Sequence, residues 1–209
     1  MKRCVIVGGA PIEKYERIRS YLNPKEDYYI FCDCGLRHAE PLSITPDLIV
    51  GDFDSYARPE TTAETIVLPT VKDDTDTVHA LNEAIERGYT DYLFIGMTGR
   101  RLDHTLGNVY MLVHAFEQGL NALMVDDYSE ISVVADKPVQ IDDSQPFFSL
   151  INITGRARGI YIDEAKYPLN GAEIKYDYQY GVSNEVLPGQ TATVRVEDGL
   201  LLLIRDAEG

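Results

Sequence analysis

The sequence predicts an α/β domain followed by an all-β domain. Up to residue 127, short apolar runs alternate with segments whose apolar residues recur at helical spacing, which favours a largely parallel sheet covered by helices. After residue 127, apolar and polar residues alternate and turn residues separate the runs, as in antiparallel strands. We therefore expect a Rossmann-like three-layer α/β domain at 1–127 and an antiparallel β-sandwich at 128–209, with a barrel as the alternative.

Short apolar runs predict the strands of the first domain. Each run is too short for a buried helix and is followed by glycine, proline or polar residues. The predicted strands are Cys4–Val7, Tyr28–Cys32, Asp47–Val50, Thr65–Leu68, Tyr92–Ile95 and Ala122–Val125.

Helices are expected between these strands, where apolar residues recur every three or four positions and so share one helix face. Gly88 and Gly119 stand where a helix C-terminus favours a left-handed residue. The apolar sets are Ile12, Tyr15, Ile18 and Leu22; then Val78, Leu81 and Ile85; then Leu106, Val109, Tyr110 and Val113.

The second domain is predicted to contain strands without an amphipathic helix. The two domains should join near Asp126 to Ser129. The expected strands are Ile131–Val134, Phe147–Ile153, Gly159–Ile162, Glu173–Tyr178, Thr191–Val196 and Leu200–Arg205.

The composition favours a folded protein without nucleic-acid or membrane partners. Apolar residues make up 44% of the 209 residues, enough for a buried core. Acidic residues number 34 and basic residues 19, so the net charge of −15 repels a phosphate backbone. The first apolar run is too short for a signal peptide or a membrane span. Cys4, Cys32 and Cys34 match no zinc or thioredoxin spacing, so we expect reduced thiols in the cytoplasm, with Cys32 and Cys34 as small side chains at a strand end.

Acidic residues gather just after the predicted strands, where an open α/β sheet binds its ligands. Two close carboxylates repel by about 1 kcal/mol even in water, so converging acids require a cation. Oxygen ligands without His or Cys favour Mg²⁺, which shares its shell with water and phosphates. A single Asp-rich turn could instead cap a helix, but several acidic strand ends favour a metal or phosphate site. The acids are Asp33, Asp52, Asp54, Asp73, Asp74, Asp76 and Asp103.

Two glycine-containing segments are candidates for binding anions. Backbone N–H groups of Gly8-Gly9-Ala10-Pro11 could face a phosphate, although a tight turn needs the same glycines. In the segment from Gly96 to His104, two arginines could bind phosphate oxygens while Asp103 balances their charge, or Asp103 could cap a helix. His104 could orient a carboxylate or phosphate or make a structural hydrogen bond, whereas His38, His79 and His114 show no ligand spacing.

At these motifs the sequence resembles the thiamine pyrophosphokinase family. Similar segments occur in order along both predicted domains, which is more specific than any one motif. They are Pro46 to Ser55, similar to P-D-x-x-x-G-D-F-D-S; Lys72 to Asp76, similar to K-D-x-T-D; Gly99 to Asn108, similar to G-G-R-x-D-H with a later Asn; Lys166 to Leu169, similar to K-Y-P-L; and Val182 to Glu185, similar to V-S-N-E.

Two segments depart from the family pattern. Arg100 stands where the family often has a second glycine, and Cys32-Asp33-Cys34-Gly35 replaces A-D-G-G. The chemically important Asp33, Gly35, Arg101 and Asp103 are kept, so the departures concern local backbone shape. The Cys34 side chain, where the family has glycine, could alter how closely a nucleotide approaches.

The resemblance implies an enzyme, a thiamine diphosphokinase, that transfers the pyrophosphoryl group of ATP to the thiamine hydroxyl. Thiamine attacks the β-phosphorus directly and AMP leaves, a reaction that demands positioning and neutralisation of charge. The resemblance also implies Mg²⁺ as cofactor and ATP as co-substrate. It further implies a homodimer whose active sites lie between the α/β domain of one subunit and the β domain of the other.

Roles for individual residues follow from the same resemblance. The leading metal ligands would be Asp52, Asp54 and Asp76, and Asp33 and Asp73 would be the next candidates. The catalytic set would be Asp52, Asp54, Asp73, Asp76, Arg101 and Asp103, with Asp73 or Asp103 as general base unless Mg²⁺ makes a base unnecessary. ATP would be bound by Gly8, Gly9, Asp33, Gly35, Lys72, Thr75, Gly99, Arg101, His104 and Asn108, and the thiamine pyrimidine by Ser183 and Asn184.

Two rival functions belong to other classes. Asp52-Phe53-Asp54-Ser55 also reads as the D-x-D motif of a haloacid-dehalogenase-like phosphatase, with Asp52 as nucleophile and Asp126-Asp127 after a later strand. That reading leaves the segments at Lys72 and Gly99 unexplained. A non-catalytic Mg-nucleotide-binding module is the second rival, although the acids exceed what binding alone requires.

Overall fold

The computed structural model describes residues 3–53, 60–71 and 74–206 of the chain. It divides into two compact units, Met1–Asp127 and Tyr128–Gly209, each described below by itself. Among the described helices, none is both long and apolar enough to cross a lipid bilayer.

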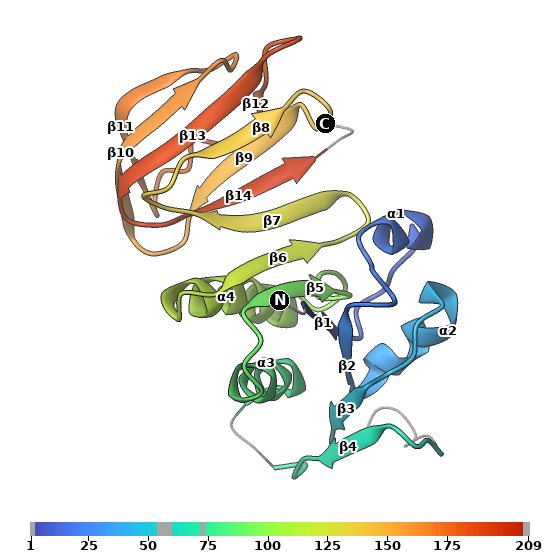
Figure 1. Ribbon diagram of the computed structural model, residues 1–209. Helices are drawn as coiled ribbons and strands as arrows, with labels where there is room; N and C mark the ends of the chain where they lie inside the picture. The colour runs from blue at the N-terminus through green and yellow to red at the C-terminus, as the bar shows by residue number, and fades with distance from the viewer. Residues whose placement is uncertain (1–2, 54–59, 72–73, 207–209) are drawn as a thin grey trace. The chain divides into compact units, whose positions relative to one another are not determined.

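A parallel sheet forms the centre of the first unit (Figure 1). Its strands lie in the order β6-β5-β1-β2-β3-β4, and β1 pairs with β2 on one side and β5 on the other. The order reverses at β1, and open α/β sheets bind ligands beyond the carboxyl ends at such a point. The strands are β1 (Cys4–Val7), β2 (Tyr28–Cys32), β3 (Leu48–Gly51), β4 (Glu64–Val67), β5 (Asp91–Ile95) and β6 (Asn121–Val125).

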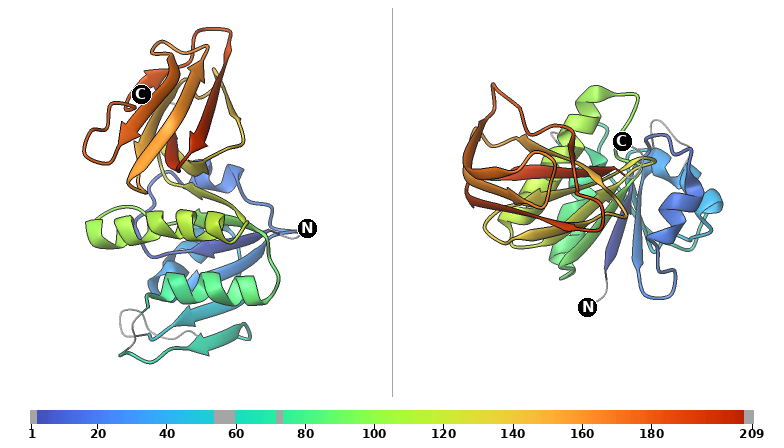
Figure 2. Two further views of the ribbon diagram at one scale, coloured as in Figure 1. Left: turned by 90° about the vertical axis from the view of Figure 1, so that its left-hand side faces the viewer. Right: turned by 90° about the horizontal axis from the view of Figure 1, so that it is seen from above.

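Helices cover both faces of this sheet. They are α1 (Tyr15–Ser20), the 3-10 helix η1 (Asp33–His38), α2 (Ala39–Leu42), α3 (Asp76–Glu86) and α4 (Leu102–Glu117). Figures 1 and 2 show α3 and α4 on one face and α1 and α2 on the other. Val5 and Phe31 pack with Ile18 of α1 and Leu42 of α2, whereas Ile6 points to the opposite face because successive side chains alternate along a strand. The prediction of an α/β domain is confirmed at this level.

The helices differ from the sequence prediction in extent and in the face they bury. Helix α1 begins after Ile12, which lies outside it but still joins the core. In α4, Leu106 and Tyr110 are each 52% exposed, whereas the neighbouring Met111 and Leu112 are buried. Apolar periodicity locates a helix, but where two apolar stripes are available only the surrounding packing decides which is buried.

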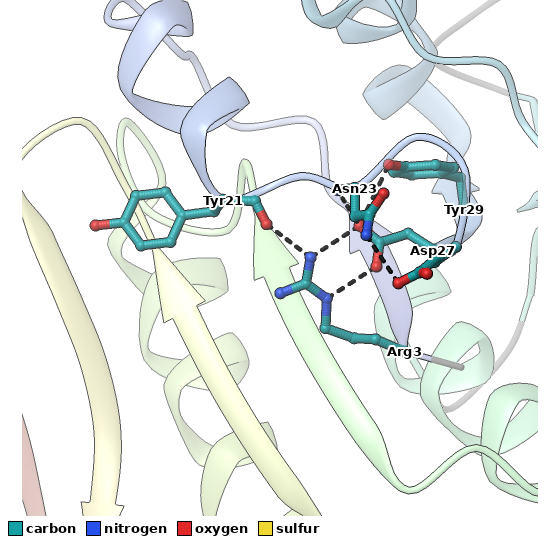
Figure 3. Close-up of polar contacts among 6 residues, drawn as sticks. Arg3, Tyr21, Asn23, Asp27 and Tyr29 are labelled. Atoms are coloured by element: carbon teal, nitrogen blue, oxygen red, sulfur yellow. Dashed lines mark hydrogen bonds and ion pairs between the residues drawn. The ribbon is translucent and has the colours of Figure 1, made fainter. Parts of the chain in front are cut away.

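A hydrogen-bonded group closes the loop between α1 and β2, near the amino end of the sheet (Figure 3). The Arg3 guanidinium donates to both carboxylate oxygens of Asp27, at 3.0 and 2.8 Å, and to the Tyr21 carbonyl at 2.6 Å. Asp27 also accepts from the Asn23 backbone N–H and the Tyr29 hydroxyl. Its side chain is only 3% exposed, so this bidentate pair is partly buried and fixes the loop in a single geometry.

Antiparallel strands make up the second unit, whose residues 128–206 include no helix. One set pairs in the order β12-β9-β14-β7 and the other in the order β11-β10-β13-β8. Leu150 and Leu203 of the first set share a buried core with Ile160, Ile174 and Val194 of the second. The strands are β7 (Ser129–Val134), β8 (Val139–Asp142), β9 (Phe147–Asn152), β10 (Arg156–Asp163), β11 (Leu169–Lys175), β12 (Asn184–Glu185), β13 (Thr191–Asp198) and β14 (Leu201–Asp206). The prediction of an all-β second domain is confirmed.

Candidate active site

Three aspartates from separate segments converge beyond the carboxyl ends of the sheet. Asp33 follows β2, Asp52 follows β3, and Asp76 is the first residue of α3. One carboxylate oxygen from each lies within 4.8 Å of the others. Asp33 is buried, while Asp52 and Asp76 are half-buried. Three oxygen ligands at this spacing suit a hard divalent cation, which would offset their mutual repulsion.

Other predicted members of this group lie outside the described residues. They are Asp54 and Ser55 of the segment Pro46 to Ser55, and Lys72 and Asp73 of the segment Lys72 to Asp76.

Local backbone geometry brings Asp33 and Asp52 together. Asp33 has a φ of 28° and Phe53 a φ of 59°, both in the left-handed region that L-residues rarely adopt. Gly51 is the last residue of β3, and a Cβ at this position would lie 3.0 Å from the Asp33 Cβ. Glycine at position 51 therefore favours the close approach of these two strand ends, and the strain at Asp33 is of the kind found at ligand sites.

The glycine turn after β1 packs against the neighbouring segments. The Gly8 N–H donates to the Ile95 carbonyl and the Ala10 N–H to the Gly96 carbonyl, each at 2.9 Å. These two donors are therefore engaged with the backbone rather than directed at a ligand. A Cβ on Gly9 would overlap the Cys34 sulfur. The turn thus depends on the segment that departs from the family pattern.

His38 contacts this turn through a hydrogen bond to the Ala10 carbonyl. The side chain is 1% exposed, and its Nε2 lies 2.8 Å from the Ala10 carbonyl, which can only accept. The Nδ1 atom therefore accepts from the Tyr15 hydroxyl, also at 2.8 Å. Burial lowers the pKa of His38, since the charged ring would lose its hydration. His38 is accordingly a neutral structural residue, in agreement with its lack of ligand spacing.

Arg101 and Asp103 form an exposed pair at the start of α4. The guanidinium donates to both carboxylate oxygens, at 3.2 and 2.6 Å, and both side chains are 65% exposed. The hydrogen bond from Arg101 lowers the pKa of Asp103 to about 2, so this carboxylate is a weak base in the ligand-free protein. His104 is exposed beside them. Arg100 has a φ of 44°, in the left-handed region that glycine adopts without strain.

Thr75 and Asn108, both expected to contact ATP, are joined to each other through Thr77. Thr77 Oγ1 lies 2.9 Å from Thr75 Oγ1 and donates to Asn108 Oδ1 at 3.0 Å. Asn108 Nδ2 donates to the Met97 carbonyl at 2.8 Å. Sequence reasoning missed Thr77, which lies next to a motif without belonging to it.

Asp126 and Asp127 have structural partners. Asp126 accepts from the Thr98 hydroxyl at 2.9 Å, and Asp127 accepts from the backbone N–H groups of Glu13 and Lys14 at 2.9 and 2.8 Å. These contacts fix the start of α1 and do not favour the phosphatase reading, in which this pair would help to form the active site.

A cavity of about 480 Å³ lies in the second unit. The side chains that shape it combine aromatic rings, hydroxyls and charges, a mixture suited to a flat cationic ligand. Ser183, one of the residues expected to contact thiamine, lies in its wall and has a φ of 62°. The lining residues are Phe147, Phe148, Ser149, Lys166, Tyr167, Ser183, Glu185, Ile204 and Asp206.

Asn184 lies behind the wall of this cavity. The side chain is 5% exposed, and its Oδ1 accepts from the backbone N–H groups of Tyr167 and Glu185, while its Nδ2 donates to the Tyr167 carbonyl. The Ser183 backbone N–H donates to the Ser149 hydroxyl at 3.0 Å. Asn184 therefore holds Tyr167 at the cavity, whereas Ser183 lines it. Sequence reasoning missed Ser149, and it placed Tyr167 in the K-Y-P-L segment without giving it a role.

Comparisons with known proteins match both units. The family described as thiamin pyrophosphokinase, catalytic domain, matches residues 20–124, and the thiamin pyrophosphokinase vitamin B1 binding domain matches residues 136–201. The chain is 26% identical to thiamine pyrophosphokinase of Bacillus subtilis (strain 168), with all of both chains covered. The crystal structure of thiamine pyrophosphokinase from B. subtilis matches at a TM-score of 0.87 and 25% identity over all of both chains. A Geobacillus thermodenitrificans thiamin pyrophosphokinase matches at 0.83 and 25% identity, covering 99% of this chain and 98% of that one.

Proposed function

The chain belongs to the thiamin pyrophosphokinase family, and from this premise we propose how its described residues serve the transfer. The enzyme is a thiamine diphosphokinase, which transfers the pyrophosphoryl group of ATP to the thiamine hydroxyl and releases AMP. The phosphatase and the non-catalytic module are not favoured.

We propose that Asp33, Asp52 and Asp76 hold Mg²⁺, together with Asp54 outside the described residues. The observation that supports this proposal is the convergence of their carboxylate oxygens within 4.8 Å from three separate segments. Bound Mg²⁺ would neutralise phosphate oxygens as charge moves toward the leaving AMP.

ATP is proposed to lie along the carboxyl ends of β1, β2 and β5, where Gly9 and Gly35 allow the turn after β1 and η1 to pack closely together. Arg101 would bind phosphate oxygens, with Asp103 orienting its guanidinium fork. His104 and Lys72 are proposed phosphate contacts. The low pKa of Asp103 disfavours it as the base for the hydroxyl, so Asp73 or metal activation of the hydroxyl is preferred.

Thiamine is proposed to bind in the cavity of the second unit. Lys166 pairs with the Glu185 carboxylate at 2.8 Å, so the Asp206 carboxylate is the group proposed to balance the cationic thiazolium ring, and Tyr167 offers the ring an aromatic surface. Ser183 lies where a hydroxyl can reach a ring substituent.

We also propose a role for each domain, a homodimeric assembly and a cellular location. The first unit is a Rossmann-like three-layer domain that binds nucleotide and metal, and the second a β-sandwich that binds thiamine and forms the dimer. The chain is a homodimer whose active sites combine the first unit of one subunit with the second unit of the other. A cytoplasmic location is favoured by the three free thiols.

The activity is tested by incubating the protein with ATP, Mg²⁺ and thiamine and resolving the nucleotides and thiamine products. We expect equal amounts of AMP and thiamine diphosphate, dependent on both thiamine and Mg²⁺. Formation of ADP, or release of phosphate regardless of thiamine, would contradict the function.

Site sharing between subunits has a separate test by mixing two inactive variants. Asp76→Asn alters the first unit, and Ser183→Lys places a like charge against the thiazolium. In a shared-site heterodimer one active site carries both changes and the other carries neither, so refolded mixtures should regain about a quarter of wild-type activity. If each subunit forms its own site, the mixture stays inactive.

A further inference from the structure

A directional chain of hydrogen bonds links α3 to α4 next to Asp76. The Met97 carbonyl can only accept, so the Asn108 amide directs its Nδ2 there, at 2.8 Å, and its Oδ1 toward Thr77. Thr77 donates its single hydroxyl hydrogen to that Oδ1, at 3.0 Å. Its oxygen therefore accepts from the Thr75 hydroxyl, at 2.9 Å. The order of donation is fixed as Thr75 to Thr77 to Asn108 to the Met97 carbonyl.

This chain engages the groups that would otherwise contact ATP. The Thr75 hydroxyl hydrogen is directed at Thr77, and Thr75 Oγ1 also accepts from the Val78 N–H at 3.4 Å. Thr75 therefore presents oxygen lone pairs, which an anionic phosphate repels. Asn108 likewise uses its carbonyl oxygen and one of its two amide hydrogens within the protein.

The chain also fixes the position of Asp76. That residue stands between Thr75 and Thr77 in the first turn of α3, and its own carbonyl lies 3.8 Å from the buried Cys32 thiol. Met97 is 1% exposed and follows β5 just before the Arg101 loop. Two elements that carry different parts of the site are thus joined through one threonine hydroxyl.

We propose that Thr77 is a positioning residue for the transfer, which sets the Asp76 carboxylate against the start of α4. The inference rests on the proposed role of the aspartates in holding Mg²⁺. Thr75 and Asn108 then act on the site through Thr77. Residues that orient metal ligands in this way typically contribute about 10–100-fold to metal affinity or activity.

Thr77→Val tests this role because it keeps the side-chain shape and removes both hydrogen bonds. We expect kcat to fall, and the Mg²⁺ concentration for half-maximal activity to rise, by about 10-fold or more, with the thiamine KM within about twofold. Calorimetric titration of Mg²⁺ with the unreactive ATP analogue that carries a methylene bridge between its α- and β-phosphates should show a matching loss of affinity. Thr77→Ser keeps the hydroxyl and should restore these values to near wild type.

Thr90→Val is the matched control. It removes a hydroxyl that donates to Asp91 at 3.1 Å, at the amino end of β5 away from the site, and should leave Mg²⁺ dependence unchanged. The proposal is overturned if Thr77→Val matches Thr90→Val, if Thr77→Ser is as impaired as Thr77→Val, or if the thiamine KM changes as much as kcat. Absence of thiamine-dependent AMP formation in the wild type would instead reject the proposed function, and the calorimetric comparison would still test Thr77.

Discussion

Replacing Asp76 with Asn should stabilise the metal-free protein while weakening its response to Mg²⁺. Asp76 lies within 4.8 Å of the carboxylate oxygens of Asp33 and Asp52. At 4.8 Å two unit charges repel by about 0.9 kcal/mol in water and about 3.5 kcal/mol at an effective dielectric constant of 20. Removing one carboxylate relieves two such repulsions, or about 1.7 to 7 kcal/mol.

One favourable term opposes this gain. Asp76 is the acidic residue in the first turn of α3, where a negative charge contributes about 0.3–1 kcal/mol to helix stability. Even the smallest repulsion leaves a net gain of about 1 kcal/mol, equivalent to about 2–4 °C in the unfolding midpoint of a chain this size. Mg²⁺ at 100 times its dissociation constant should stabilise the wild type by about 2.7 kcal/mol, and Asp76→Asn by much less.

The assay is denaturant unfolding of both proteins, in EDTA and across a range of Mg²⁺ concentrations. Asp74→Asn is the control, since it removes an exposed carboxylate from the same segment but outside the cluster. It should change stability by no more than about 0.5 kcal/mol. The reasoning is refuted if Asp76→Asn gains no stability in EDTA and keeps the Mg²⁺ response of the wild type.

Three further predictions concern the turn after β1 and the residues packed against it. Gly9→Ala should raise the KM for ATP and destabilise the protein by about 1–3 kcal/mol, because the added methyl group overlaps the Cys34 sulfur. Cys34→Gly should restore the stability and the KM of Gly9→Ala. Additive losses of stability in the double variant would contradict this contact. Gly35→Ala should not be rescued by any side-chain change, since its methyl group would overlap the Val7 carbonyl. The pKa of His38 is lowered in the folded protein, so the unfolded chain binds a proton at this residue first as the pH falls. The free energy of unfolding should therefore fall as the pH drops below about 6.5. It should fall less steeply in His38→Gln, which keeps a hydrogen-bond donor for the Ala10 carbonyl. Equal pH dependence of the two proteins would remove His38 as the cause.

The general plan of the fold and the aspartate cluster could be predicted from the sequence because both follow from local patterns. Apolar runs locate the strands, and the rule that ligands bind beyond the carboxyl ends of parallel strands brings Asp33, Asp52 and Asp76 to one edge. The Thr77–Asn108 contact could not be predicted, since it depends on how α3 and α4 are placed against each other.

Two other features show where local patterns are insufficient. The 3-10 helix Asp33–His38 contains Gly35 and spans too few residues to show a helical period, so its geometry is set by packing against the glycine turn. Arg100 gives no sign of its left-handed backbone until the loop is seen. In each case tertiary contacts outweigh the local preference.

The hydrogen bonds from Glu13 and Lys14 to Asp127 have a consequence for synthesis of the protein. Asp127 is the last residue of the first unit and lies 114 positions after Glu13. As the chain leaves the ribosome, β1 is made first, yet its partner β5 ends only at Ile95. One edge of β1 therefore stays open for pairing with other chains until β5 has been made, a stage at which nascent proteins depend on chaperones. The start of α1 can therefore form its hydrogen bonds to Asp127 only after the last residue of the first unit has been made.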